Sequence, residues 1–175
     1  MSERYEKVSD TFNARVDGVD DGGWDDPAPC EGWVARDVVR HLAEWLPGFF
    51  ASWDVDFGDL PEEPVARWRA VDAAIRAGLA DPEVAERRRD TPMGPQTFAE
   101  AVGTFCLGDV LVHTWDLARA TSQDEALDPA EVHDIYVSMQ PADEVIRGEH
   151  FGPKVAVPDD ADEQTRLLAF VGRNV

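Results

Sequence analysis

Apolar residues recur every three or four positions along most of the chain, which is the spacing of one face of an α-helix. The first such stretch covers residues 5–19, and the second covers residues 34–53. Within the second, Pro47 is expected to bend the helix or tighten its last turns. A third stretch begins at Val65 and ends near Asp81, which precedes a proline. The pattern therefore predicts helices that each bury one apolar side.

The fourth predicted helix has the clearest start signal. Thr97 and Glu100 form a capping box, with Thr as the N-cap and Glu at the third helical position, and the helix should run to about Thr121. Asp128 and Pro129 repeat this start for a fifth helix, since proline is favoured at the first helical position. Both helices are therefore defined by their first turns as well as by their apolar spacing.

The connections between these helices are rich in proline, glycine and acidic residues. Residues 54–64 form an acidic connection, residues 86–95 are expected to be irregular or hairpin-like, and a final short helix covers residues 163–171. No internal repeat or composition shift divides the chain. We therefore expect one all-α domain over residues 1–175, an antiparallel four-helix bundle with an extra short C-terminal helix.

Charge excludes several classes of partner. The chain has 36 acidic and 16 basic residues and a formal net charge of −20, so its surface repels nucleic acid and anionic lipid. No apolar run reaches the roughly 20 residues that span a bilayer. The N-terminus lacks the apolar segment of a signal peptide, and Cys30 and Cys106 form no closely spaced motif. A cytoplasmic protein with reduced thiols is expected.

Two ionisable side chains stand out on the fourth helix. Asp109 and His113 are four residues apart and share a stripe with apolar Val102, Cys106 and Leu117, so the stripe should face the interior. Burying an unpaired carboxylate costs several kcal/mol, and a bound cation would remove that cost. Bundle interiors commonly hold metals through carboxylates and histidines on facing helices.

His41 reaches the same interior if the second and fourth helices are neighbours. Two imidazoles and one carboxylate form a three-ligand divalent-metal site with open positions, as zinc hydrolases and non-haem iron oxygenases use. The residue types alone do not name the metal. Two simpler interpretations stay open, since a histidine beside an apolar stripe is usually a packing residue and an Asp/His pair at this spacing is usually a local ion pair.

Other polar residues are weaker candidates. Asp116 is either a substitute ligand, an outer acceptor that holds an imidazole, or a solvated residue. Cys106 is best interpreted as a small core residue. Nothing near Cys30 indicates an activated thiolate, although its loop can approach a pocket. His133 and His150 are expected at the surface.

The basic run 87–89 is most simply a solvated turn, and an anion contact is its less favoured role.

Three segments resemble one known family. PCEGWVARDVVRHLAEW (residues 29–45) and GDVLVHTWDLARAT (residues 108–121) resemble two signatures of the DinB-like superfamily, in particular the N-terminal metal-binding domain of mycothiol-dependent maleylpyruvate isomerases. Residues 151–173 are similar to the end of small, single-domain actinobacterial members. The resemblance covers nearly the whole chain.

The resemblance implies a four-helix bundle with a divalent metal, most often zinc or nickel, held by His41, Asp109 and His113. It also implies a low-molecular-weight thiol such as mycothiol or bacillithiol as a partner. The family carboxylate is Glu, so Asp109 is one methylene shorter. The isomerases carry an additional C-terminal domain for which this chain has no room, so maleylpyruvate isomerisation itself is not expected.

The function expected from these observations is a metal-dependent thiol transferase or addition enzyme that acts on a small electrophile. The sequence supports no separate general base and assigns no catalytic or thiol-binding residue. A non-catalytic metal-stabilised binding or structural bundle and a metal-dependent hydrolase are the alternatives. A homodimer is compatible with the family, but no interface stripe is separable from the core.

Overall fold

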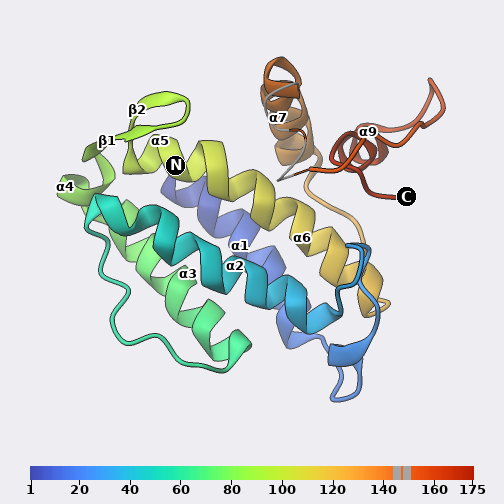
Figure 1. The fold of residues 1–175 in the computed structure, drawn as a ribbon, viewed down its shortest axis with the longest axis horizontal. Helices are drawn as coiled ribbons and strands as arrows, with labels where there is room; N and C mark the ends of the chain where they lie inside the picture. Colours follow the sequence, from blue (N-terminus) through green and yellow to red (C-terminus); the bar gives the residue numbers. More distant parts are fainter. Residues whose placement is uncertain (144–146, 148–150) are drawn as a thin grey trace.

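A computed structural model of the chain describes residues 1–143, 147 and 151–175. Four long helices form its main body, and each packs against two of the others (Figure 1). They are α1 (Ser2–Asp17), α2 (Ala35–Phe50), α3 (Pro64–Ala80) and α6 (Leu107–Ala120). α1 and α2 both contact α3 and α6, so the apolar faces of all four meet in one core. The prediction of a mostly helical chain is confirmed.

Two neighbouring pairs of helices run in the same direction, which differs from the expected antiparallel order. Arg89, which follows α3, donates to the carbonyl of Ser52, which follows α2, so α2 and α3 end together. Gln123 after α6 donates to the carbonyl of Arg15 near the end of α1, so these two helices also end together. The physical reason is the connection 54–63, which returns along the length of the helices instead of making a short turn (Figure 1).

Local start signals place most helices where the sequence predicts them. The capping box is present, because the Glu100 backbone N–H donates to Thr97 Oγ1 and Glu100 accepts from the Thr97 N–H. It begins α5 (Phe98–Ala101), which continues through a π-helical turn, η3 (Val102–Cys106), into α6. Asp128 caps α7 (Pro129–Met139) by accepting from the Glu131 N–H. These contacts satisfy backbone donors that a helix start leaves free.

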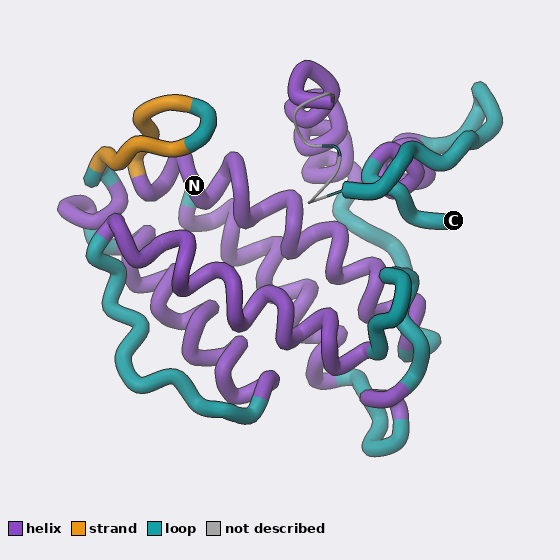
Figure 2. The backbone as a smooth tube through the Cα atoms, in the orientation of Figure 1, coloured by secondary structure: helices purple, strands orange, loops and turns teal. Residues whose placement is uncertain are grey.

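A small hairpin confirms the hairpin-like alternative expected for residues 86–95 and departs from a purely α-helical chain. Arg88 and Arg89 lie in its first strand, so the interpretation of the basic run as a solvated turn is wrong in part. The strands β1 (Arg88–Thr91) and β2 (Gly94–Thr97) pair antiparallel, with Arg88 opposite Thr97 (Figure 2). Arg87 donates to the backbone carbonyl of Trp53, in the 3-10 turn η2 (Ala51–Trp53), and Arg89 donates to the carbonyl of its neighbour Ser52. The carbonyls of Ser52 and Trp53 lie at the helix end, where carbonyls lack partners within the helix and need donors. The two arginines supply these donors and so connect the end of α2 to the hairpin.

The C-terminal part of the chain lies beside α6. The helix α9 (Glu163–Phe170) packs against α7, and its start is capped by Asp162, which accepts from the Thr165 N–H (Figure 1). Gly172 follows α9 with a φ of +89°, a conformation that favours glycine. This turn directs the last residues back toward α6.

Three short elements complete the described chain, namely η1 (Gly23–Asp25), α4 (Pro82–Ala85) and η4 (Gln140–Ala142). His150 lies outside the described residues. Among the described residues, no helix combines the length and apolar character needed to cross a bilayer.

Candidate metal centre

The three residues singled out by the sequence converge at the interface of α2 and α6. His41 lies in the middle of α2, and Asp109 and His113 lie one turn apart on α6. Nε2 of His41 is 3.3 Å from Oδ2 of Asp109, and Nε2 of His113 is 3.4 Å from Oδ1 of Asp109. One donor atom from each side chain lies within 4.8 Å of the others. The condition that the second and fourth predicted helices be neighbours is therefore met.

These separations fit a divalent cation. Ligand bonds of about 2.1 Å in a tetrahedral site place the ligand atoms about 3.4 Å apart. Each imidazole nitrogen lies at about that spacing from one oxygen of Asp109, His41 at 3.3 Å from Oδ2 and His113 at 3.4 Å from Oδ1. The donor chemistry, two imidazole nitrogens and one carboxylate, also suits zinc, nickel and iron. The residues present can hold such an ion with positions left for a ligand.

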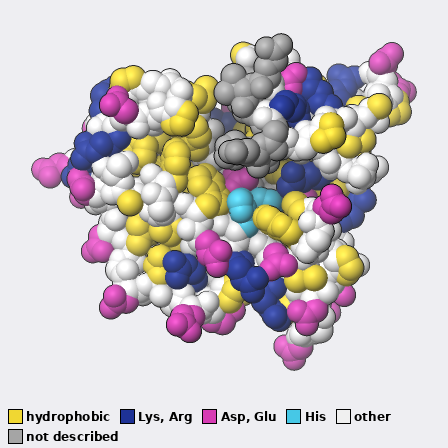
Figure 3. Space-filling view, viewed as in Figure 1, with side chains coloured by type: hydrophobic (Ala, Val, Ile, Leu, Met, Phe, Trp, Pro, Cys, Tyr) yellow, Lys and Arg dark blue, Asp and Glu magenta, His cyan; other side chains and the backbone are white. Residues whose placement is uncertain are grey.

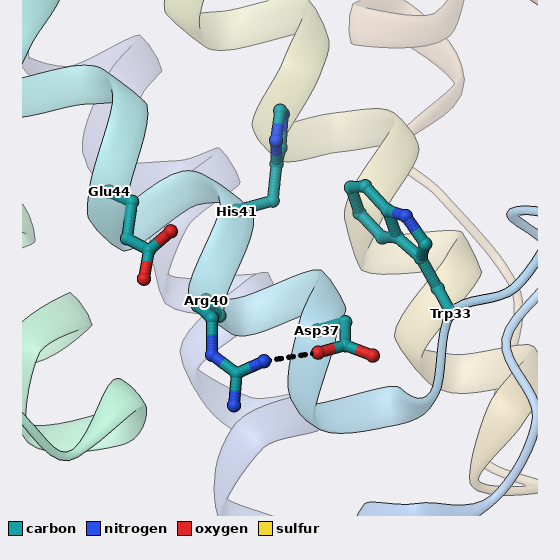
Figure 4. Close-up of a pocket in the computed structure, with 5 residues that line it drawn as sticks. All are labelled: Trp33, Asp37, Arg40, His41 and Glu44. Carbon is teal, nitrogen blue, oxygen red and sulfur yellow. Dashed lines mark hydrogen bonds and ion pairs between the residues drawn. The ribbon is translucent and has the colours of Figure 1, made fainter.

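The cluster is buried on one side and accessible on the other. The His41 side chain is 34% exposed and that of Asp109 is 19% exposed, whereas His113 is 5% exposed. A cavity of about 340 Å³ lies beside His41 and is lined also by Trp33, Asp37, Arg40 and Glu44 (Figure 4). In the space-filling view, histidine side chains are visible in a hollow bordered by hydrophobic side chains (Figure 3). A small molecule can therefore approach the cluster from the His41 side.

Electrostatics in the absence of a metal favour a proton on His113. Burial would lower the pKa of His113, but the Asp109 charge and hydrogen bonds to Asp109 and Asp116 raise it to about 9. Burial would likewise raise the pKa of Asp109, but the charge of His113 and hydrogen bonds with both histidines hold it well below its usual range. The metal-free site thus contains the Asp109 carboxylate and the His113 imidazolium. A bound cation would take the place of the positive charge on His113.

Asp116 holds His113 from the opposite side of the ring. The Asp116 side chain is fully buried, and its Oδ2 lies 2.8 Å from Nδ1 of His113. Arg173, near the C-terminal end of the chain, donates to both oxygens of Asp116. Its Nε lies 3.1 Å from Oδ1, and its Nη2 lies 2.6 Å from Oδ2. Of the three roles open for Asp116, the solvated one is wrong, and the contacts are those of an outer acceptor that orients the imidazole.

Sequence reasoning missed the tryptophans of the site. The Trp45 indole N–H donates to Oδ2 of Asp109 over 2.9 Å, which fixes the carboxylate. Trp33 stacks on His113, with ring centroids 5.9 Å apart and an interplanar angle of 18°. Trp45 follows His41 by one helical turn, so its spacing was an available signal. Trp33 lies in the loop before α2, where no periodicity marks it.

Cys30 lies at the edge of the site as an unactivated thiol. Its Sγ accepts from Nη2 of Arg173 over 3.2 Å and lies 3.6 Å from Oδ2 of Asp116. Burial and the Asp116 charge raise the pKa of Cys30 to about 12, with Arg173 opposing them. Although Cys30, His113 and Asp116 also form a group of donor atoms, the Arg173 guanidinium already supplies positive charge there.

The remaining candidates lie away from the centre. Cys106 is fully buried in the core, and burial raises its pKa well above the usual value. His133 is exposed and contacts Glu163 on α9, with Nδ1 3.0 Å from the carboxylate. These placements agree with the core and surface roles that the sequence predicts.

Comparison with known proteins assigns the chain to a family. Residues 5–118 match the family described as the mycothiol maleylpyruvate isomerase N-terminal domain. The chain belongs to this family. It is also similar to uncharacterized proteins from two strains of Mycobacterium tuberculosis, each 28% identical over 98% of this chain and 96% of the relative. No solved structure shows a significant match to the chain.

The family match contains all three candidate ligands and Asp116. It ends at residue 118, so Arg173 lies beyond it.

Proposed function

We propose that the protein holds a divalent metal ion, zinc or nickel, through Nε2 of His41, a carboxylate oxygen of Asp109 and Nε2 of His113, and uses it for thiol chemistry. The observation that supports this proposal is the convergence of the three donor atoms within 4.8 Å, in a member of this family. The substrates would be a low-molecular-weight thiol of the mycothiol type and a small electrophile. In such an addition the S–H bond of the thiol and one π bond of the electrophile would break, the sulfur would bond to the electrophilic carbon, and the proton would end on the atom that receives the π electrons, with no leaving group.

The scaffold in this proposal is a single domain over residues 1–175, built on a four-helix bundle in the cytoplasm. It acts without nucleic acid or membrane partners, alone or as a homodimer. The acidic chain, with a net charge of −20, supports the exclusion of polyanionic partners.

The protein side chains would prepare the site before any ligand arrives. Trp45 holds Oδ2 of Asp109, and Asp116 holds Nδ1 of His113, so Nε2 of that ring is left to face Asp109. Although Asp109 is one methylene shorter than the family Glu, its oxygens still lie 3.3 and 3.4 Å from the two imidazoles. A bound divalent cation would supply the positive charge that keeps a thiol deprotonated at neutral pH.

Access and water exclusion would come from the tryptophans. Trp33 and Trp45 both lie near the His41 ring, with ring centroids at 5.2 and 6.2 Å, and would exclude part of the surrounding water, while 34% of the His41 side chain stays exposed. The thiol and the electrophile would therefore enter from the cavity of about 340 Å³ beside His41. Because Asp37, Arg40 and Glu44 also line that cavity, it would suit a substrate with polar groups.

The test is turnover by metal-loaded protein supplied with mycothiol and a panel of small electrophiles, followed by thiol consumption and product mass. His113→Ala should abolish turnover and metal uptake. His133→Ala, which removes an exposed histidine far from the centre, is the matched control and should change neither.

Each other outcome is informative. Turnover that survives His113→Ala would refute the proposed site. Metal uptake and stabilisation without turnover would favour a binding or structural bundle, and activity without any thiol would favour a hydrolase.

A further inference from the structure

We propose that Arg173 is a positioning residue for the metal centre, and that the C-terminal segment 151–175 is thereby part of the site. This inference rests on the proposed metal-binding function. The contact chain is short, because Arg173 binds Asp116, Asp116 binds Nδ1 of His113, and Nε2 of His113 faces Asp109. Among the described residues, Arg173 makes no hydrogen bond or ion pair with a proposed metal ligand, so its hydrogen-bonded path to the centre runs through Asp116.

The first argument is the geometry around Asp116. Its carboxylate has no exposed surface, and an unpaired buried charge is strongly destabilising. Nε and Nη2 of Arg173 donate to its two oxygens, a two-point contact that fixes the plane of the carboxylate. With that plane fixed, Oδ2 lies 2.8 Å from Nδ1 of His113 and orients the ring. Without Arg173, the Asp116 carboxylate would be free to rotate and would no longer fix the orientation of the His113 ring.

The second argument is how firmly Arg173 is itself held. Its side chain is 12% exposed, and its backbone N–H donates to the carbonyl of Leu168 over 2.9 Å. Gly172 makes the preceding turn with a φ of +89°, and a Cβ there would lie 3.3 Å from the carbonyl oxygen of Pro153. Glycine thus allows both the turn and the close approach of residue 153 that bring Arg173 to Asp116.

The third argument is the attachment of α9 to the rest of the molecule. Gln164 on α9 accepts from the Leu127 backbone N–H over 2.9 Å and donates to the Glu125 carbonyl over 3.0 Å. The buried face of α9 packs against α7. These contacts, which hold α9 in place, do not involve the metal ligands. The position of Arg173 is therefore set by α9 and not by the metal centre.

A positioning role has a reciprocal consequence. If docking of the C-terminal segment increases metal affinity, metal binding must stabilise that docking by the same factor. Zinc should therefore slow hydrogen exchange of backbone amides in α9, although α9 contributes no ligand to the proposed centre.

The experiment compares Arg173→Met with Arg166→Met in the full chain. Arg166 is the matched control, because it is an arginine of the same C-terminal segment, on α9, but donates to the carbonyl of Asp159, away from the centre. We expect Arg173→Met to weaken zinc affinity about 10- to 100-fold and to alter the visible absorption of bound Co²⁺. We expect Arg166→Met to leave the affinity and the spectrum unchanged, and zinc protection of α9 to be lost only in Arg173→Met.

Arg173→Lys keeps the charge and serves if the methionine variant does not fold. A single ammonium cannot reproduce the two-point contact, so the zinc affinity of Arg173→Lys should lie between those of wild type and Arg173→Met. If Arg173→Met does not fold, the zinc affinity of Arg173→Lys should still be measurably below that of wild type. Equal zinc affinity in wild type and the folded Arg173 variants, or undiminished zinc protection of α9 in them, would overturn the proposal.

A metal-free measurement separates this inference from the proposed function. The ¹⁵N signals of the His113 ring should change in Arg173→Met or Arg173→Lys and not in Arg166→Met. If wild type takes up no metal, the proposed function fails. Unchanged ring signals would then overturn the orientation of His113 by Arg173 as well, whereas a shift confined to the Arg173 variants would support it.

Discussion

The stability of the metal-free protein should decrease as pH rises from about 6.5 to about 9, because the folded state holds a proton on His113. The ring lies between two carboxylates, with Nε2 3.4 Å from Asp109 and Nδ1 2.8 Å from Asp116. In the unfolded chain these neighbours are gone, and the imidazole titrates near its ordinary value. The folded state therefore binds this proton more tightly than the unfolded state does.

The size of the effect follows from the two pKa values of His113. A pKa raised from 6.5 to about 9 corresponds to up to about 3 kcal/mol of stabilisation. Its contribution is complete below pH 6.5 and is lost as the pH passes through the folded value. Asp109 and Asp116 act oppositely, because their lowered pKa values give stability that is lost as the pH falls below about 4. The metal-free protein should be most stable between these limits.

Urea unfolding in the presence of a chelator, repeated from pH 5 to pH 9, measures this dependence. His113→Gln should remove most of the alkaline loss, whereas His133→Gln, at an exposed site, should retain it. A wild-type stability that does not change across this range, or the same alkaline loss in His113→Gln, would refute the electrostatic argument.

Three further substitutions test separate contacts. Trp45→Phe keeps an aromatic ring but removes the N–H that Asp109 accepts, so zinc affinity in a chelator competition should fall about tenfold; unchanged affinity would contradict this. Gly172→Ala places a side chain at a φ of +89° and should lower the free energy of unfolding by at least about 1 kcal/mol in urea titrations, an expectation that equal midpoints would contradict. Thr97→Ala removes the cap bond to the Glu100 N–H and should cost about 1 kcal/mol while zinc affinity stays unchanged; altered affinity would contradict a purely structural role.

The fold was most predictable where local chemistry determines it. The capping box at Thr97 and Glu100 and the Asp128 cap are contacts within one turn, so the residue types alone place the helix starts. The relative directions of the helices were not predictable, because they depend on the path of residues 54–63. That path is held by distant partners, such as Arg89, which donates to the carboxylate of Asp54 at its start.

The same distinction applies to the site. Asp109 and His113 were recognisable because they share one helix and one apolar stripe. His41 was recognisable because the segment around it, residues 29–45, resembles a family signature. The contact between Arg173 and Asp116 spans 57 positions in sequence and joins a terminal turn to a buried helix face. No spacing rule encodes such a pair, since it depends on where Gly172 directs the chain.

Charge balance connects the two states of the site. In the metal-free protein the carboxylates of Asp109 and Asp116 are balanced by the guanidinium of Arg173 and the imidazolium of His113. A divalent cation in place of the His113 proton would leave this largely buried group with one net positive charge. Because isolated buried charge is costly, a singly charged anion is the ligand that restores neutrality. A thiolate would meet that requirement.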